Sequence, residues 1–336
     1  MLKLLVFDNN APLYLDFLRE VLQTEWDIKA GPDCTDWLKH EIGEADAAIG
    51  LQLHTQLLPY ARRLKILLFP GAGTFHQDPN ELPAGCLHAN VYEHEIPIAE
   101  YVFFAMLALK TGLLDSATAF RRGEWVGSGR LTGEPHAELY GGTLGLIGFG
   151  HIGLEVARRA PAFGLGVQSV RRHSEWTISD MQPVRFLSGP DGVDTLLKTS
   201  DVVVVACPLT HETRGMLNRR RLRLLKKDAV LINVARAEII EEEALYDALR
   251  ERWFASAALD VWYRYPKAEG DYETGSRFPF YTLPNVLATP HASAWTREML
   301  QRRARQMAAN LDRFARGEPI QRVILRGTWR NGAPLP

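Results

Sequence analysis

Short apolar runs alternate with longer amphipathic stretches along most of this chain. A nearly continuous apolar run is typical of a strand buried on both faces, whereas apolar residues three or four apart indicate a helix that packs on one side. The predicted strands are Lys3–Phe7, Ala47–Leu51, Ile66–Phe69, Leu87–Val91, Leu144–Ile147, Gly166–Val170, Val202–Ala206, Ala229–Asn233, Ala255–Leu259 and Val286–Ala288. The predicted helices are Tyr14–Leu22, Ile96–Thr111, Leu154–Phe163 and Thr296–Arg316. This alternation predicts α/β domains built on parallel sheets.

A glycine-rich turn joins one of these strands to the helix that follows it. The run Leu144–Ile147 leads into Gly148-x-Gly150-x-x-Gly153, and a helical pattern begins at Leu154. The first glycine permits the turn, the second lets the backbone approach a pyrophosphate, and the third lets the helix pack on the strand. The phosphates then lie on free N–H groups at the helix N-terminus. The motif in this context predicts a dinucleotide site.

The residues after the next strand indicate which dinucleotide binds. An NAD site usually carries Asp or Glu at this point, where it accepts a hydrogen bond from the ribose 2′-hydroxyl. This chain has Arg171, Arg172, His173 and Ser174 instead. Guanidinium groups bind a 2′-phosphate through two hydrogen bonds at once, so the pattern predicts NADP, with NADPH preferred over NAD. The alternative is a basic loop that is simply solvated.

Length, charge and cysteine usage exclude several classes of protein. A chain of 336 residues is long enough for about two domains. Its formal charge of −1 provides no general attraction for nucleic acid or for an anionic membrane. No apolar run can span a bilayer, and the three cysteines form neither a disulfide framework nor a zinc pattern. We therefore expect a cytoplasmic protein with a small-molecule substrate, no metal site, and no nucleic-acid or membrane partner.

The position of the glycine turn also predicts the domain order. Because the dinucleotide unit begins near the middle of the chain, the N-terminal hundred residues or so are expected to form a separate domain. The loop Pro266–Pro279 is rich in charge, Gly and Pro, and loops of this length are usually functional or disordered. The basic stretch Arg219–Lys227 carries leucines at helical spacing, which predicts a solvated helix face.

Three polar residues follow predicted strands in the second half of the chain, namely Arg236, Asp260 and His291. In a doubly wound sheet, ligands bind beyond the carboxyl ends of the strands. Arginine can bind a substrate carboxylate and polarise a carbonyl, and histidine can exchange the proton that accompanies hydride transfer. Each residue taken singly is more often an ordinary surface or loop residue. Their joint occurrence after a dinucleotide motif predicts an active site for hydride transfer.

These features, with several further segments, resemble the D-isomer-specific 2-hydroxyacid dehydrogenase family, which includes glyoxylate/hydroxypyruvate reductases. The likeness extends over nearly the whole chain. The matching segments are Pro70–Gly73, Asn90, Ile98–Glu100, Gly141–Gly153, Cys207–Thr213, Leu231–Arg236, Ala258–Val261, Leu283–His291 and Gly317–Pro319.

The resemblance implies a fold of two doubly wound parallel-sheet domains. A Rossmann NAD(P)-binding domain, residues 98–291, is inserted into a flavodoxin-like substrate domain formed by residues 1–97 and 292–336. Members usually pair through the nucleotide domain, which implies a homodimer.

The resemblance also implies roles for individual residues. Arg236 binds the substrate carboxylate and keto oxygen, His291 is the proton donor and acceptor, and Asp260 contacts the nicotinamide amide. Substrate contacts also come from Ala72, Gly73 and Asn90. The implied cofactor contacts are Gly148, Gly150, His151, Ile152, Gly153, Arg171, Arg172, Ser174, Cys207, Pro208, Thr213, Val234, Ala235, Asp260 and His291.

One position departs from the family pattern. The family places a glutamate five residues after the aspartate, where it hydrogen-bonds the histidine, and this chain has Tyr265 there. A neutral phenol can orient the imidazole but supplies no charge to stabilise the imidazolium. An acid of the following loop, Glu269, Asp271 or Glu273, is a candidate replacement, although loop acids are more often simply solvated.

The sequence therefore predicts an NADPH-dependent reductase of a small 2-ketoacid, or the reverse D-2-hydroxyacid dehydrogenase, without naming the acid. The altered Tyr265 leaves open a nucleotide-binding sensor or corepressor-like protein that has lost useful turnover. An adenosylmethionine-dependent methyltransferase shares the glycine turn. However, it would carry an acid near Arg171, and it leaves Arg236 and His291 unexplained.

Overall fold

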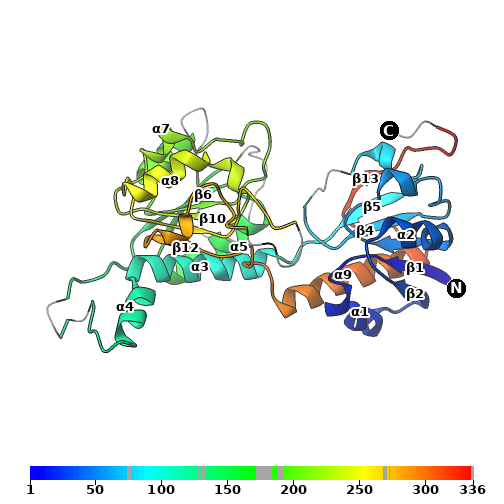
Figure 1. The fold of residues 1–336 in the computed structure, drawn as a ribbon, viewed down its shortest axis with the longest axis horizontal. Coiled ribbons are helices and arrows are strands. Elements are labelled where there is room, and N and C mark those ends of the chain that lie inside the picture. Colours follow the sequence, from blue (N-terminus) through cyan, green and yellow to red (C-terminus); the bar gives the residue numbers. More distant parts are fainter. Residues whose placement is uncertain are drawn as a thin grey trace. The chain divides into compact units, whose positions relative to one another are not determined.

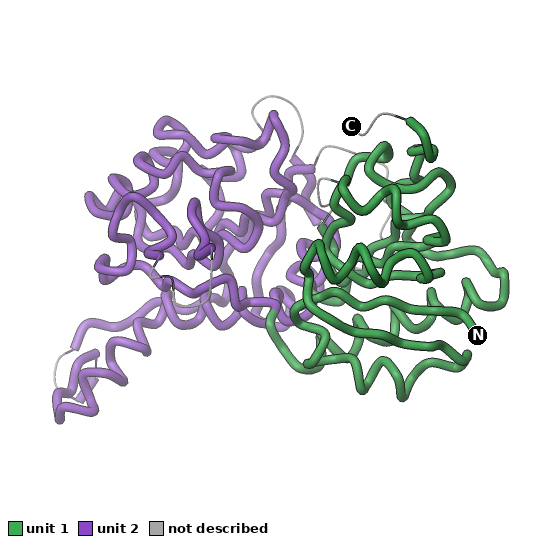
Figure 2. Tube along the Cα trace, turned by 45° about the vertical axis from the view of Figure 1, so that its right-hand side comes forward, with its two compact units in different colours: residues 1–94, 295–336 green, residues 95–294 purple. Residues whose placement is uncertain are grey.

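The computed structural model describes residues 1–73, 77–127, 129–130, 133–171, 184–187, 192–267, 271 and 273–333. The chain forms two compact units, shown in different colours in Figure 2. Unit 1 consists of Met1–His94 and Trp295–Pro336, and unit 2 consists of Glu95–Ala294. The second unit is thus a single stretch of chain that interrupts the first.

Unit 1 is built on a six-stranded sheet of order β13-β5-β4-β3-β1-β2 (Figure 1). Five strands are parallel and β13 pairs antiparallel with β5 at one edge. The two faces of the sheet carry separate apolar clusters, and α1 packs with α9 over one of them. The strands are β1 (Leu2–Val6), β2 (Trp26–Ala30), β3 (Ala47–Ile49), β4 (Ile66–Phe69), β5 (Leu87–Asn90) and β13 (Val323–Arg326). The helices are α1 (Leu15–Val21), α2 (Thr35–Glu41) and α9 (Arg297–Ala315).

Unit 2 contains a seven-stranded, fully parallel sheet of order β12-β11-β10-β9-β6-β7-β8 (Figure 1). An all-parallel sheet needs both faces covered, and two apolar clusters flank its buried central strands. The strands are β6 (Thr143–Ile147), β7 (Gly166–Val170), β8 (Arg185–Leu187), β9 (Val202–Val205), β10 (Val230–Asn233), β11 (Ser256–Leu259) and β12 (Val286–Ala288). The helices are α3 (Glu95–Thr111), α4 (Leu113–Phe120), α5 (His151–Arg159), α6 (Gly192–Thr199), α7 (Arg219–Leu222) and α8 (Glu242–Arg250).

These two sheets confirm the predicted fold class, in which both units are α/β with parallel sheets. In unit 2 the strand order reverses between β6 and β9, which is the topological switch point where doubly wound folds bind ligands. Short 3₁₀ helices connect several elements of both units. They are η1 (Ala11–Leu13), η2 (Ile42–Glu44), η3 (Thr55–Leu57), η4 (Pro79–Glu81), η5 (Ala160–Phe163), η6 (Ala237–Ile239) and η7 (Phe280–Thr282).

Two helical predictions differ from the structure. The helix after the glycine turn begins at His151, three residues before the predicted start, so Gly153 lies inside its first turn. The helix predicted over the basic stretch Arg219–Lys227 ends at Leu222. Its arginines bind acids of neighbouring helices: Arg219 lies 2.6 Å from Asp247 and Arg221 lies 2.8 Å from Asp194. The basic stretch therefore fastens α7 to α6 and α8.

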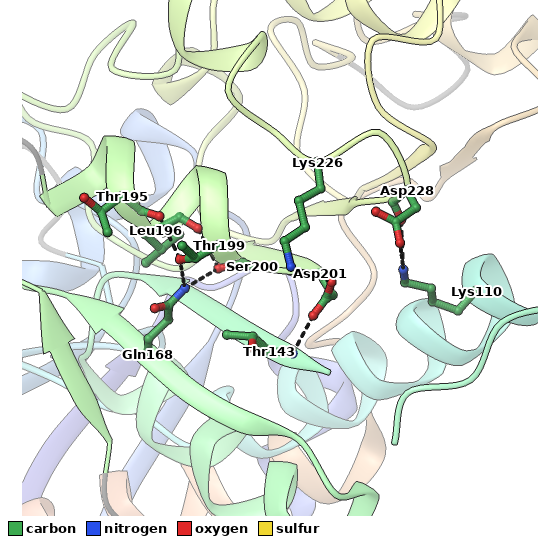
Figure 3. Close-up of polar contacts among 10 residues, drawn as sticks. All are labelled: Lys110, Thr143, Gln168, Thr195, Leu196, Thr199, Ser200, Asp201, Lys226 and Asp228. Carbon is green, nitrogen blue, oxygen red and sulfur yellow. Dashed lines mark hydrogen bonds and ion pairs between the residues drawn. The ribbon is translucent and has the colours of Figure 1, made fainter. Parts of the chain in front are cut away.

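A polar cluster ties elements together at the amino ends of the unit 2 strands (Figure 3). The carboxylate of Asp201 accepts the backbone N–H of Thr143 at 2.7 Å and the ammonium of Lys226 at 2.8 Å. Gln168, on β7, donates to the hydroxyls at the end of α6, including that of Ser200 at 2.9 Å. A Cβ at Gly145 would lie 2.1 Å from that same Ser200 hydroxyl oxygen, so β6 needs glycine where α6 packs on it.

Within the described part of the chain, no single helix has both the length and the hydropathy to cross a membrane. Helices α3 and α4, which are bent relative to one another, have the required length and hydropathy only when they are counted together.

Candidate active site

The glycine turn between β6 and α5 has the shape that the motif predicts. Gly148 has a φ of +102°, and a Cβ there would lie 2.6 Å from the backbone nitrogen of Cys207. A Cβ at Gly153 would lie 2.6 Å from the carbonyl oxygen of Gly148. At Gly150, by contrast, no described atom lies within 4 Å of the Cβ position, so the space beside this residue is open. The open position at the start of α5, whose first N–H groups have no helical acceptor, fits a dinucleotide pyrophosphate.

Two loops at the carboxyl ends of β9 and β10 hold further residues of the predicted cofactor site. In the first, the hydroxyl of Thr213 donates to the carbonyl of Pro208 at 2.8 Å and accepts the N–H of Thr210 at 2.7 Å, which closes the loop on itself. Cys207 opens this loop, and burial raises the pKa of its thiol to about 11, so the group stays neutral. In the second loop, Val234 and Ala235 are buried.

Arg171 follows β7 directly, at the position that decides between NAD and NADP. Its guanidinium carbon lies 4.0 Å from the centre of the Phe186 ring, on β8. Phe186 in turn meets Phe149, inside the glycine motif, edge to face at 5.2 Å between ring centres. Stacking of this kind restricts a planar guanidinium to one orientation. The other two predicted contacts to this end of the cofactor, Arg172 and Ser174, lie outside the described residues.

Arg236 lies beyond the carboxyl end of β10, on a turn that the buried side chain of Asn233 shapes. The Asn233 amide donates to the carbonyl of Arg236 at 3.0 Å and accepts the N–H of Ala235 at 3.1 Å. The guanidinium of Arg236 is exposed and donates to the carbonyl of Ala235 at 2.7 Å. Among the described residues, no carboxylate lies within ion-pair distance of it. An exposed cation without a protein counter-ion suits an anionic substrate.

His291 and Tyr265, 26 positions apart in sequence, meet through a hydrogen bond. The phenol oxygen of Tyr265 lies 2.8 Å from Nδ1 of His291 and accepts the N–H of Trp262 at 3.2 Å. A phenol can donate to an unprotonated Nδ1 or accept from a protonated one, so Tyr265 orients the ring in either protonation state. Burial lowers the pKa of His291; the charge of Asp260 opposes this shift and that of Arg236 adds to it. The site thus favours the neutral imidazole.

Two acids of the following loop accept backbone N–H groups within that loop. Glu273 accepts the backbone N–H of Gly275 at 3.2 Å, and Asp271 accepts that of Lys267 at 2.9 Å. Glu269 lies outside the described residues. The ring nitrogen Nδ1, which a replacement carboxylate would have bound, is occupied by Tyr265.

Asp260, at the end of β11, is fully buried under the turn that carries His291. Its carboxylate accepts the hydroxyl of Thr289 at 2.6 Å and the backbone N–H groups of Ala292 at 2.8 Å and Ser293 at 2.9 Å. Thr289 also contacts the phenol of Tyr101, on α3, at 2.8 Å. Neither Thr289 nor Tyr101 was predicted from the sequence to have a role. Thr289 lay within a matched motif, whereas nothing in the pattern marked Tyr101.

The predicted substrate contacts Ala72, Gly73 and Asn90 lie together in unit 1. The first two follow β4, and Asn90 ends the adjacent strand β5. The buried amide of Asn90 donates to the carbonyl of Ala72 at 3.1 Å, and the N–H of Val91 donates to the carbonyl of Gly71 at 3.0 Å. The side chain of Asn90 therefore fixes the turn after β4 at the carboxyl edge of this sheet.

Comparison with known proteins connects this arrangement to one family. The sequence profile described as "D-isomer specific 2-hydroxyacid dehydrogenase, NAD binding domain" matches residues 103–293. The chain is 31% identical over 330 residues to a D-3-phosphoglycerate dehydrogenase of Methanocaldococcus jannaschii, a match that covers 96% of this chain and 59% of the relative. It is 30% identical over 316 residues to a glyoxylate reductase of Thermococcus kodakarensis, covering 89% and 90% of the two chains.

The fold is similar to solved structures over almost the whole chain. One is the crystal structure of a D-isomer-specific 2-hydroxyacid dehydrogenase family protein from Aeromonas salmonicida. It has a TM-score of 0.77 and 26% sequence identity, and the match covers 96% of this chain and 99% of that one.

Proposed function

The chain belongs to the D-isomer-specific 2-hydroxyacid dehydrogenase family, whose members are nicotinamide-dependent oxidoreductases, and we propose that it reduces a small 2-ketoacid of the glyoxylate or hydroxypyruvate type with NADPH. The observation that carries the proposal is the pair formed by Arg236 and His291 at the carboxyl edge of one sheet. Among the described residues, Arg236 has no carboxylate within ion-pair distance, and its charge lies close enough to lower the pKa of His291. Beside them on the same edge, the glycine turn offers an open position for a dinucleotide.

The residues present divide the reaction among them. When bound, the nicotinamide supplies the hydride. Arg236 binds the substrate carboxylate and polarises the keto oxygen. His291 gives a proton to the developing alkoxide from Nε2, because Tyr265 occupies Nδ1. In the reverse direction, the neutral ring keeps its proton on Nδ1, where the Tyr265 oxygen accepts it, and Nε2 removes the hydroxyl proton.

The preference for NADPH is supported by the stacked arginine after β7. Arg171 is held over Phe186, so its planar fork is oriented before any ligand arrives. A preorganised guanidinium loses little freedom when it binds a 2′-phosphate, and no acid follows β7 directly to bind a ribose hydroxyl.

A screen of small 2-ketoacids with NADPH oxidation as the readout tests the proposed function. We expect turnover with at least one short ketoacid, and weaker turnover with NADH. A protein that binds NADPH tightly and reduces none of a broad panel would instead be the nucleotide sensor that the altered Tyr265 leaves open.

A homodimer is the assembly that the surface of unit 2 supports. Helix α4 projects away from the sheet of this unit (Figure 1). The segment 113–126, which we call the arm, begins with this helix and exposes several large apolar side chains. They are Leu113, Leu114, Phe120, Trp125 and Val126. Exposed apolar side chains gathered on one projecting segment indicate a protein interface. A second copy of the chain is the partner we propose, because a symmetric pair covers both arms at once.

The compartment we propose is the cytoplasm. Cys34, Cys86 and Cys207 are all unpaired in the structure. Free cysteines persist where thiols are kept reduced, and a pool of nicotinamide cofactor is present there. Fractionation of cells that express the protein tests this placement.

A further inference from the structure

The backbone of His291 is held in an unusual conformation. Its φ is +57°, in the left-handed region that side chains with a Cβ rarely adopt. The surrounding structure must compensate for such a conformation if it is to persist. The residues on both sides of His291 are bound to a single carboxylate, since Asp260 accepts the Thr289 hydroxyl before the histidine and the N–H groups of Ala292 and Ser293 after it.

The carboxylate is connected through Thr289 to a helix far away in sequence. The Thr289 hydroxyl has one proton, and a carboxylate can only accept, so that proton goes to Asp260. The phenol of Tyr101 must then donate to Thr289, at 2.8 Å. Burial raises the pKa of Tyr101 to about 12, so the phenol keeps its proton at ordinary pH. The order of donors is therefore Tyr101, then Thr289, then Asp260.

Two further hydrogen bonds hold Thr289 at its backbone carbonyl. The indole N–H of Trp262 donates to the carbonyl of Thr289 at 2.8 Å, and the backbone N–H of His291 donates to that carbonyl at 3.0 Å. Thr289 is thus restrained at both its hydroxyl and its carbonyl. Trp262 also donates its backbone N–H to the phenol of Tyr265. One residue therefore holds both the turn that carries His291 and the phenol that contacts its imidazole ring.

We propose that Tyr101 and Thr289 are positioning residues for His291, which hold the Asp260 carboxylate against the turn so that the imidazole keeps one orientation and one tautomer. Asp260 accordingly acts through the turn, because its carboxylate is buried and binds three protein donors. This inference rests on the proposed reductase function for its kinetic consequence. Its structural consequence, a single tautomer of His291, does not depend on turnover.

The test uses the full-length protein with Tyr101→Phe, Thr289→Val and Thr289→Ser. The first two remove one hydroxyl each, and Thr289→Ser keeps the hydroxyl and serves as the conservative rescue. Tyr14→Phe is the matched control, because the buried Tyr14 phenol also binds a carboxylate, that of Asp8 at 2.9 Å, in unit 1. Imidazole nitrogen shifts are measured by NMR on histidine-labelled protein, with the His291 signal assigned by its loss in His291→Gln.

We expect one tautomer of His291 in the wild type, in Thr289→Ser and in Tyr14→Phe, and averaged signals in Tyr101→Phe and Thr289→Val. With an accepted ketoacid, kcat should fall on the order of tenfold to a hundredfold in those two variants, with KM and the Kd for NADPH nearly unchanged. The effects of the two should not add in the double variant, since both break one chain of hydrogen bonds.

Tyr101→Phe and Thr289→Val variants that lose thermal stability but keep the wild-type ring signals and kcat would overturn the inference. If the wild type turns over no ketoacid, the ring signals alone still decide it, and the proposed function fails separately.

Discussion

The phenol oxygen of Tyr265 lies 2.8 Å from Nδ1 of His291, where the family pattern places a carboxylate. A carboxylate would accept a proton from Nδ1 and stabilise the imidazolium by its charge, whereas this phenol, which also receives the Trp262 N–H, is neutral. The hydrogen bond that orients the ring is retained, and the charge that favours its protonated form is absent. The histidine pKa is correspondingly low, with burial as the main cause.

Tyr265→Glu should therefore shift the pH dependence of ketoacid reduction upward. Reduction needs protonated His291, so kcat/KM is full below the histidine pKa and falls as pH rises through it. In the wild type this fall should lie below the usual value of about 6.5. The glutamate raises the pKa by stabilising the imidazolium, which moves the fall to higher pH. The measurement is a pH profile of kcat/KM with one ketoacid.

Tyr265→Gln is the control for that experiment, because it matches glutamate in size and remains neutral. Its profile should stay close to that of the wild type. Superimposable profiles for all three proteins would show that the group at position 265 does not set the protonation of His291.

Arg171→Ala should weaken NADPH binding by about 1.5–3 kcal/mol, the usual contribution of a hydrogen bond to a charged group, and leave NADH binding nearly unchanged. Phe186→Leu should act in the same direction with a smaller effect, because it removes the ring that holds the guanidinium. Titration of both cofactors by fluorescence measures the two constants. Arg223→Ala is the matched control. The guanidinium carbon of Arg223 also lies over an aromatic ring, 3.7 Å from the centre of Trp253, but Arg223 is not part of the proposed cofactor site. Equal affinities of the wild type for NADPH and NADH would contradict the proposed preference.

Arg236→Gln and His291→Gln should remove turnover without removing the cofactor. Loss of a proton donor typically costs on the order of 10²–10⁴-fold in rate, and a guanidinium that binds both carboxylate and carbonyl should matter at least as much. Arg236→Lys keeps the charge but loses the planar fork, so we expect partial activity with a raised KM. Single-turnover kinetics and NADPH titration separate the two effects. Variants that lose NADPH binding in parallel with activity would place these side chains at the cofactor instead.

Phe120→Asp should weaken the proposed dimer. Phe120, the last residue of α4, is 58% exposed, and its ring packs edge to face on that of Trp125 at 5.3 Å between ring centres. A charge at this position opposes its burial against a second copy. Sedimentation at several concentrations reads out the monomer fraction. Tyr281→Asp, at another exposed aromatic residue of unit 2, should leave the association unchanged. A wild-type protein that sediments as a monomer at all concentrations would rule out this assembly.

Gly145→Ala should destabilise unit 2 by about 1–3 kcal/mol, as overpacking of a filled core usually does. The added Cβ would lie 2.1 Å from the Ser200 hydroxyl and 2.7 Å from a methyl carbon of Leu196. Urea denaturation measures the free energy of unfolding. Gly166→Ala, in the neighbouring strand β7, is the control, since its nearest contact would be 3.9 Å away. Ser200→Ala in the Gly145→Ala background should restore part of the loss.

Periodicity alone located the buried parallel strands, because residues such as Val202–Val205 have no polar alternation and fit no exposed element. The strands missed were three of the four at sheet edges, namely β2, β8 and β13, whereas the fourth, β12, was predicted. Edge strands are only partly covered, so their sequences keep polar residues and lose the apolar signal, as Trp26–Ala30 does with one covered side. The helix start was also misplaced, because Gly153 has low helix propensity and still lies in the first turn of α5.

The sequence by itself determined the glycine turn and the polar residues at strand ends, because these features depend on neighbouring residues in the chain. Only the tertiary structure decided how those residues are held. Tyr265 reaches His291 across 26 positions, and Tyr101 reaches Thr289 across 188, so no local pattern encodes either contact. Likewise the burial of Asp260 under three donors follows from the packing of β11, β12 and α3. Hydrogen bonds between distant segments depend on where whole elements pack, because a side chain reaches only a few ångströms from its own strand or helix.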